Sequence, residues 1–68
     1  MTNYYAVALI ACRNTSNGLE VNDCPAVVLA SSEEEACGIV LSRAREEIYP
    51  EKDGWYNHKA QAVKVPAS

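Results

Sequence analysis

The chain has 68 residues, of which 49% are hydrophobic and 22% charged, and its formal net charge at pH 7 is −3. This length allows a single domain over residues 1–68, and the composition is typical of a globular protein and not of a disordered one. The scattered basic residues argue against nucleic acid as a partner, and the absence of an apolar run of about 18 residues argues against a membrane span. The uncharged start Met1–Tyr5 does not resemble a signal peptide, so we expect a cytoplasmic protein.

The first half of the chain predicts two strands joined by a turn. Tyr4–Arg13 is rich in aromatic and branched side chains and contains neither Gly nor Pro. The turn Asn14–Gly18 ends in an Asn-Gly pair, which suits a backbone with positive φ. Leu19–Ala30 predicts the returning strand. Pro25 cannot donate to a strand ladder, so it indicates an edge position or a bulge and leaves Ala26–Ala30 as the firmer section.

A helix is predicted from Ser32 to about Tyr49. Ser32 as N-cap with Glu35 three positions later fits a capping box, and acidic residues complement the dipole at the helix start. Pro50 disfavours further helix. The helix carries an apolar face at helical spacing, made of Ala36, Cys37, Val40, Leu41, Ala44 and Ile48.

A third strand is predicted over about Tyr56–Val65, which Pro66 ends. The element order then predicts an α+β fold: a three-stranded antiparallel or mixed sheet in the spatial order 2-1-3, with one amphipathic helix on one face. A right-handed crossover carries the chain from the second strand to the third. The first strand is therefore expected at the centre.

Both faces of the predicted sheet are apolar, whereas one helix can cover only one of them. The first strand presents two sets of apolar side chains: Tyr4, Ala6, Ala8, Ile10 and Cys12 on one face, and Tyr5, Val7, Leu9 and Ala11 on the other. A soluble monomer rarely leaves a patch of this size uncovered. A second copy, a partner protein, or the chain's own loops with Trp55 and Tyr56 could cover it.

Of these three arrangements we expect a homo-oligomer, with a dimer favoured, because association is a usual remedy for a small core. The predicted interface consists of Val7, Leu9, Val27, Leu29 and Ile39. The last of these projects from the polar side of the helix next to a glycine, which permits close approach, although a solitary exposed isoleucine is also normal.

The sequence contains no motif for catalysis. His58 is the only histidine, and nothing in its surroundings pairs it with a nucleophile. Cys12, Cys24 and Cys37 lack the close spacing of zinc ligands and are expected to be reduced, structural residues. We therefore expect no enzyme activity, no catalytic residue, no cofactor and no metal.

A candidate binding segment groups aromatic with hydrogen-bonding side chains at the start of the last strand, and two tyrosines begin the first strand: Trp55, Tyr56, Asn57 and His58, with Tyr4 and Tyr5. Trp and Tyr are enriched among binding hot spots. These residues predict the rim of a partner- or ligand-binding site, with the alternative that Trp55 and Tyr56 cap the core. The expected function is a non-enzymatic protein-binding module; the alternative is a homo-oligomer that binds a small molecule, such as a signalling nucleotide, between subunits.

Three segments of the chain, Tyr4–Ile10, Ala30–Ala36 and Gly54–His58 with the valine-rich end, resemble those of short accessory proteins of tailed bacteriophages. Several anti-CRISPR and other anti-defence proteins are similar in length, acidity and order of elements. The resemblance implies a small protein that acts stoichiometrically by binding, with a host defence complex as partner in the host cytoplasm. It assigns no functional residue.

Overall fold

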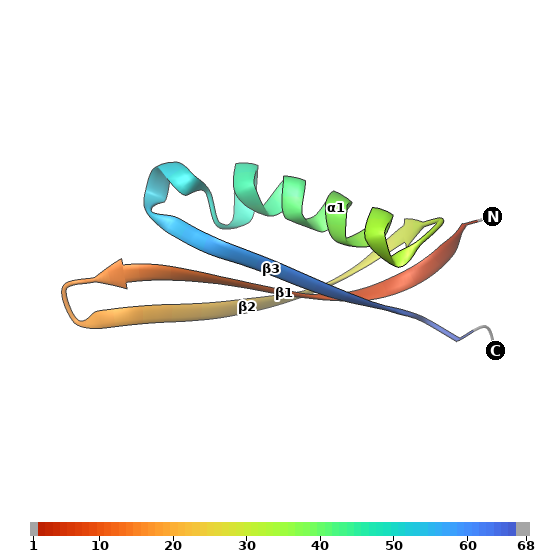
Figure 1. Ribbon diagram of the computed structural model, residues 1–68, viewed down its shortest axis with the longest axis horizontal. Helices are drawn as coiled ribbons and strands as arrows, with labels where there is room; N and C mark the ends of the chain where they lie inside the picture. Colours follow the sequence, from red (N-terminus) through yellow and green to blue (C-terminus); the bar gives the residue numbers. More distant parts are fainter. Residues whose placement is uncertain (1, 67–68) are drawn as a thin grey trace.

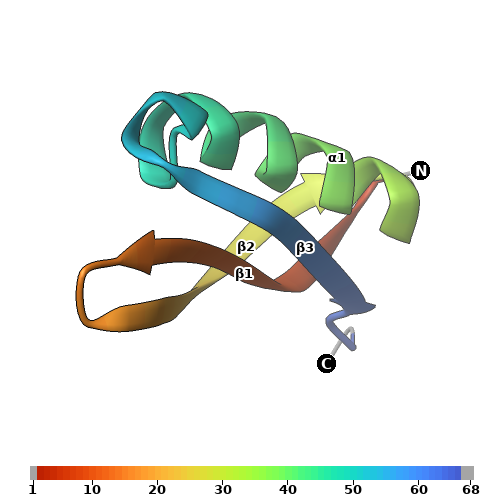
Figure 2. The same ribbon diagram turned by 60° about the vertical axis from the view of Figure 1, so that its left-hand side comes forward.

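The computed structural model describes residues 2–66. Its elements in chain order are β1 (Asn3–Thr15), β2 (Gly18–Ala30), α1 (Glu33–Arg43), the π-helical η1 (Ala44–Ile48), the short η2 (Glu51–Asp53) and β3 (Trp55–Lys64). The strands form one antiparallel sheet in the order β2-β1-β3, with α1 lying across one face (Figure 1). This confirms the predicted α+β fold, the strand order and the central position of the first strand. Figure 2 shows, from a second direction, that no other element of the described chain lies against the opposite face.

The hairpin of β1 and β2 is longer and more regular than predicted. Thr15 pairs with Gly18 across a two-residue turn, and Gly18 adopts the positive φ of 117° that favours glycine. The Thr15 hydroxyl donates to the Gly18 carbonyl over 2.9 Å and accepts from the Asn17 amide over 3.2 Å. Pro25 does not interrupt the strand and lies opposite Ala8. It is tolerated because β2 is an edge strand, which confirms the edge position that the proline indicated.

The helix begins where the capping pattern predicts. Ser32 is the N-cap, in extended conformation, and its hydroxyl accepts from the Glu35 amide over 3.1 Å. The Glu35 carboxylate reaches back to Ser31, one residue further than in a standard capping box, and accepts from its hydroxyl over 2.8 Å and from its amide over 3.3 Å. Two donors that precede the first turn are thereby satisfied.

The end of the helix departs from the predicted pattern. The Tyr49 amide donates to the Ala44 carbonyl over 2.7 Å, a five-residue step that makes η1 a π-helical turn. The buried positions Val40 and Ala44 are four residues apart, and the next buried residue, Tyr49, follows after five. Ile48 is 38% exposed, so its predicted place on the apolar face was wrong. The wider turn inserts one extra residue and rotates Tyr49 into the core instead.

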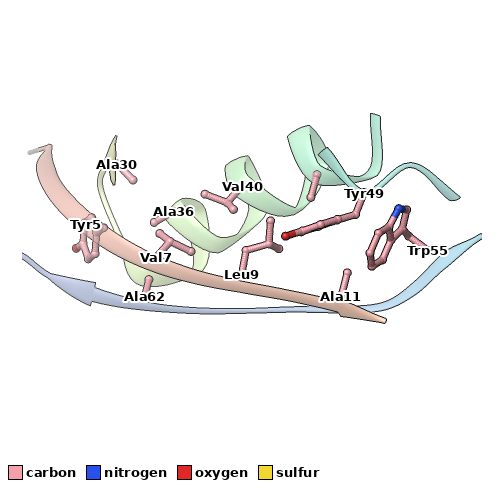
Figure 3. Packing of buried hydrophobic residues seen from close by; sticks show 11 residues of the cluster. Tyr5, Val7, Leu9, Ala11, Ala30, Ala36, Val40, Tyr49, Trp55 and Ala62 are labelled. Atoms are coloured by element: carbon pink, nitrogen blue, oxygen red, sulfur yellow. The ribbon is translucent and has the colours of Figure 1, made fainter. Parts of the chain in front are cut away.

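The core between α1 and the sheet is thin and rich in alanine (Figure 3). Ala11, Ala30, Ala36 and Ala44 are fully buried, and Leu9 is the largest side chain buried to that degree. Small residues on both surfaces let the helix lie close to the strands, so packing is tight although few large side chains take part. A core of this size supplies little surplus stability.

Substitution of Tyr49 and Ile48 tests the π-helical turn. We expect Tyr49→Ala to lower the free energy of unfolding by about 3 kcal/mol, because it empties a packed aromatic site. Ile48→Ala should lower it by less than about 1 kcal/mol, since this side chain is largely in solvent. Chemical denaturation of both variants measures the difference. A regular α-helix that continued to Tyr49 would give the opposite ranking.

Candidate interaction surface

Trp55 caps the core and does not stand at a binding rim. It is 8% exposed, and its ring centroid lies 4.7 Å from that of Tyr49, tilted by 52°. The Arg13 guanidinium carbon lies 4.6 Å above the Trp55 ring in a cation–π contact. Arg13 also donates to the Glu20 carboxylate across the hairpin, with Nη2 at 2.6 Å and Nε at 3.0 Å. Trp55 and its neighbours close one end of the core. The alternative that Trp55 caps the core is therefore the one the structure shows.

The neighbours of Trp55 point in different directions. Tyr56 is exposed on the sheet face opposite to α1, and its hydroxyl donates to Asn14 Oδ1 over 3.2 Å. Asn57 lies in a β-bulge and adopts a φ of 57°, a left-handed conformation that asparagine tolerates. His58 Nε2 lies 2.7 Å from the Tyr49 carbonyl oxygen. Because a carbonyl only accepts, this nitrogen carries the proton and holds the end of the helix against β3.

The two N-terminal tyrosines are also separated. Tyr5 is buried beneath the helix at the end of the core far from Trp55 (Figure 3). Tyr4 is 57% exposed on the opposite face of the sheet, in the row of Leu29, whereas Tyr56 lies in the row of Cys12. The structure therefore distributes the predicted rim over two faces and both ends of the molecule, and does not assemble it.

The residues predicted for an oligomer interface lie in three places. Val27 and Leu29 are exposed on the face that α1 leaves free. Val7 and Leu9 are 2% and 1% exposed and lie under α1, so their assignment to the free face was wrong. The reason is the strand register, in which Val27 stands opposite Ala6 and not opposite Val7. Ile39 is half-buried on the helix and packs partly against the core, away from the free face.

The uncovered side of the sheet, which we call the open face, is the main apolar surface of the molecule. All of the strongly exposed large hydrophobic side chains of residues 2–66 lie on it, except Ile48. From the pairing register, its members are Tyr4, Ala6, Ala8, Ile10, Cys12 and Asn14 of β1, Leu19, Val21, Asp23, Pro25, Val27 and Leu29 of β2, Tyr56, Lys59, Gln61 and Val63 of β3, and Val65. Of this set, Val27 and Leu29 were predicted for the oligomer interface, and Tyr4 and Tyr56 for the rim of a binding site.

The open face is hollowed along its middle and carries two charges. Ala6 and Ala8 of the central strand are flanked by larger side chains of the edge strands, which leaves an open hollow of about 660 Å³. Its lining is apolar apart from Gln61. The charged members of the face are Asp23 on β2 and Lys59 on β3, and both stand opposite Ile10.

The described residues give little support for a metal site or a membrane-spanning helix. Among residues 2–66, no three His, Cys, Asp or Glu side chains are grouped so that they could hold a metal ion, and no helix there is long and apolar enough to cross a membrane. Cys12, Cys24 and Cys37 are free thiols and half-buried, and the Cys37 thiol lies 3.6 Å from the Ala60 carbonyl oxygen.

No protein-family model, curated protein or solved structure matches the chain.

Tyr49 links the stability of the core to pH. Burial raises the pKa of its phenol above the ordinary value of 10.0, and the negative charges of Cys24 and Asp23 raise it further. A raised pKa in the folded state means that the neutral phenol is the form that folding favours. This contribution is complete below pH 10.0 and is lost as the pH rises towards the higher pKa of the folded protein.

We expect the free energy of unfolding to fall as the pH rises above about 10, and to fall less steeply in Tyr49→Phe, which keeps the ring but cannot ionise. Denaturation at a series of alkaline pH values measures this slope for both proteins. Equal slopes for the two would show that Tyr49 does not ionise on unfolding in this range.

Proposed function

We propose that the chain is a non-enzymatic protein-binding module that acts by stoichiometric association and uses the open face as its contact surface. The observation that carries this proposal is the concentration of exposed large apolar side chains on that one face. Soluble monomers rarely expose a contiguous apolar patch of more than a few hundred Å². Larger patches mark contacts with other macromolecules.

The shape of the molecule supports the same proposal. Its accessible surface is 4777 Å² for a mass of 7.4 kDa, whereas a compact monomer of this mass exposes about 4200 Å². Its radius of gyration of 13.2 Å exceeds the value of about 11 Å for a compact chain of this length. Extents of 46 × 19 × 14 Å describe a flat, elongated body, as expected of one half of a larger packed unit.

A protein fits the open face better than a nucleotide does. A nucleotide site needs aromatic rings for stacking together with donors for the phosphates, and the candidate aromatic residues are separated in space. Among the described residues that line the central hollow, Gln61 is the one with a polar side chain. A broad apolar surface with few charges suits the buried centre of a protein interface.

Site-specific crosslinking tests whether the open face contacts protein. A photoreactive phenylalanine analogue in place of Val27, which is 66% exposed, should give covalent protein adducts on illumination in the cells from which the chain comes. The same analogue in place of Glu47, which is exposed on η1, serves as the matched control and should give few adducts. Mass spectrometry identifies the captured chain. A folded Val27 variant without any adduct would contradict the proposed function.

The resemblance to phage anti-defence proteins supports a more specific setting, in which the protein inhibits a host defence complex in the host cytoplasm. Expression in bacteria that carry the susceptible defence system should then raise the plating efficiency of a targeted phage by at least about tenfold. Val27→Lys, which places a charge beside the hollow of the open face, should abolish this protection, and Glu47→Lys should retain it. Equal protection by both variants would show that the inhibition does not depend on the open face.

A further inference from the structure

We infer that the open face binds a second copy of this chain, in a face-to-face dimer whose two-fold axis runs parallel to β1. This inference rests on the proposed function and specifies its partner. The observation behind it is that the two charges on the open face, Asp23 and Lys59, occupy one row on opposite edges of the sheet, with Ile10 between them. A single acid and a single base arranged in this way match a second copy of themselves.

The symmetry can be followed from the strand order. A two-fold axis parallel to β1, midway between two stacked sheets, turns one copy over and exchanges its edges, so that β2 of one copy lies over β3 of the other. Asp23 then faces Lys59 of the second copy, and Lys59 faces Asp23. An axis across the strands would place each edge strand over itself and would not pair the acid with the base.

The other rows of the open face agree with the same axis. Val27 and Val63 both stand opposite Ala6, so the exchange of edges packs valine against valine. Pro25 and Gln61 both stand opposite Ala8 and form an uncharged pair. Each of these three rows, those of Ile10, Ala6 and Ala8, thus brings acid against base, apolar against apolar, or uncharged against uncharged. This row-by-row complementarity is what an isologous interface requires.

The dimensions fit a stable interface. Three strands about 4.8 Å apart and at least ten residues long give a face of roughly 500 Å² in projection, and its accessible area is larger because the side chains form ridges. Standard interfaces bury about 800 Å² on each partner. Stacked sheets lie about 10 Å apart, a gap that a long lysine and a short aspartate side chain can bridge together.

Charge reversal in the purified full chain tests the dimer. Sedimentation equilibrium of the wild type should give twice the mass of 7.4 kDa. Asp23→Lys and Lys59→Asp each create two like-charge contacts by symmetry, so each should raise the dissociation constant at least about tenfold. The double variant D23K/K59D restores opposite charges in every pair and should return to within about threefold of the wild type. Lys52→Glu, on η2 away from the open face, is the matched control and should have no effect.

The outcomes separate the inference from the proposed function. A wild-type chain that stays monomeric up to about 1 mM, well above usual dimer affinities, would overturn the second copy as partner. The proposed function would still stand if the Val27 crosslink captured a different protein. A dimer that ignores both reversals, or that the double variant fails to restore, would overturn the two-fold arrangement. Circular dichroism and thermal melting confirm that each variant is folded before its mass is interpreted.

Discussion

The register between β1 and β2 determines which side chains the helix protects and which remain in solvent. Thr15 stands opposite Gly18, and each step back along β1 is matched by one step forward along β2. Odd-numbered residues of β1 therefore share a face with even-numbered residues of β2. This arrangement puts Val7 with Ala26 under α1 and leaves Ala6 with Val27 on the open face. A slip of one residue would exchange the two sets.

The packing between α1 and the sheet relies mainly on small side chains. At the end of the core near Trp55 it relies on aromatic side chains instead. Buried alanines on the helix and the strands allow close approach, but they bury little area each. The π-helical turn compensates by turning Tyr49 into the core, where it meets Trp55. Arg13 then lies over the Trp55 ring and binds Glu20, which ties the hairpin to the end of the core. The His58 contact to the Tyr49 carbonyl fixes the same junction from β3.

Local chemistry was sufficient to predict most of the fold. The Ser32 cap, the turn before Gly18 and the proline at an edge each act through neighbouring backbone groups, so a short stretch of sequence contains the information. Ile48 was misplaced because the π-helical turn responds to tertiary packing of Tyr49, which helical periodicity does not contain. Trp55 was equally compatible with a binding rim and a core cap until the position of Arg13 was known.

The misassignment of Val7 and Leu9 has a different cause, because the sequence of the hairpin turn contains information about which residues share a face. Both faces of β1 are apolar, so composition does not distinguish them, but the number of residues in the hairpin turn does. A two-residue turn joins odd positions of one strand to even positions of the other, whereas a turn with an odd number of residues would join odd to odd. The observed turn at Ser16-Asn17 places Val27 opposite Ala6, and a turn at Asn17-Gly18 would place it opposite Ala8. Both residues lie on the same face of β1, so the Asn17-Gly18 pair contained the signal for the face that Val27 occupies and not for its exact partner.

The edges of the sheet help to explain why association would use its face. An edge strand with free backbone groups invites pairing with another chain. On β2, Pro25 removes a donor from the middle of the edge; on β3, the bulge at Asn57 and the charge of Lys59 interrupt it. These features are the usual defences against edge pairing. With the edges disfavoured and one face covered by α1, the open face is the surface of residues 2–66 that is large and apolar enough for a stable contact. Its two charges are then better understood as determinants of orientation, because they lie at the borders of the apolar middle and leave its hydrophobic contact intact.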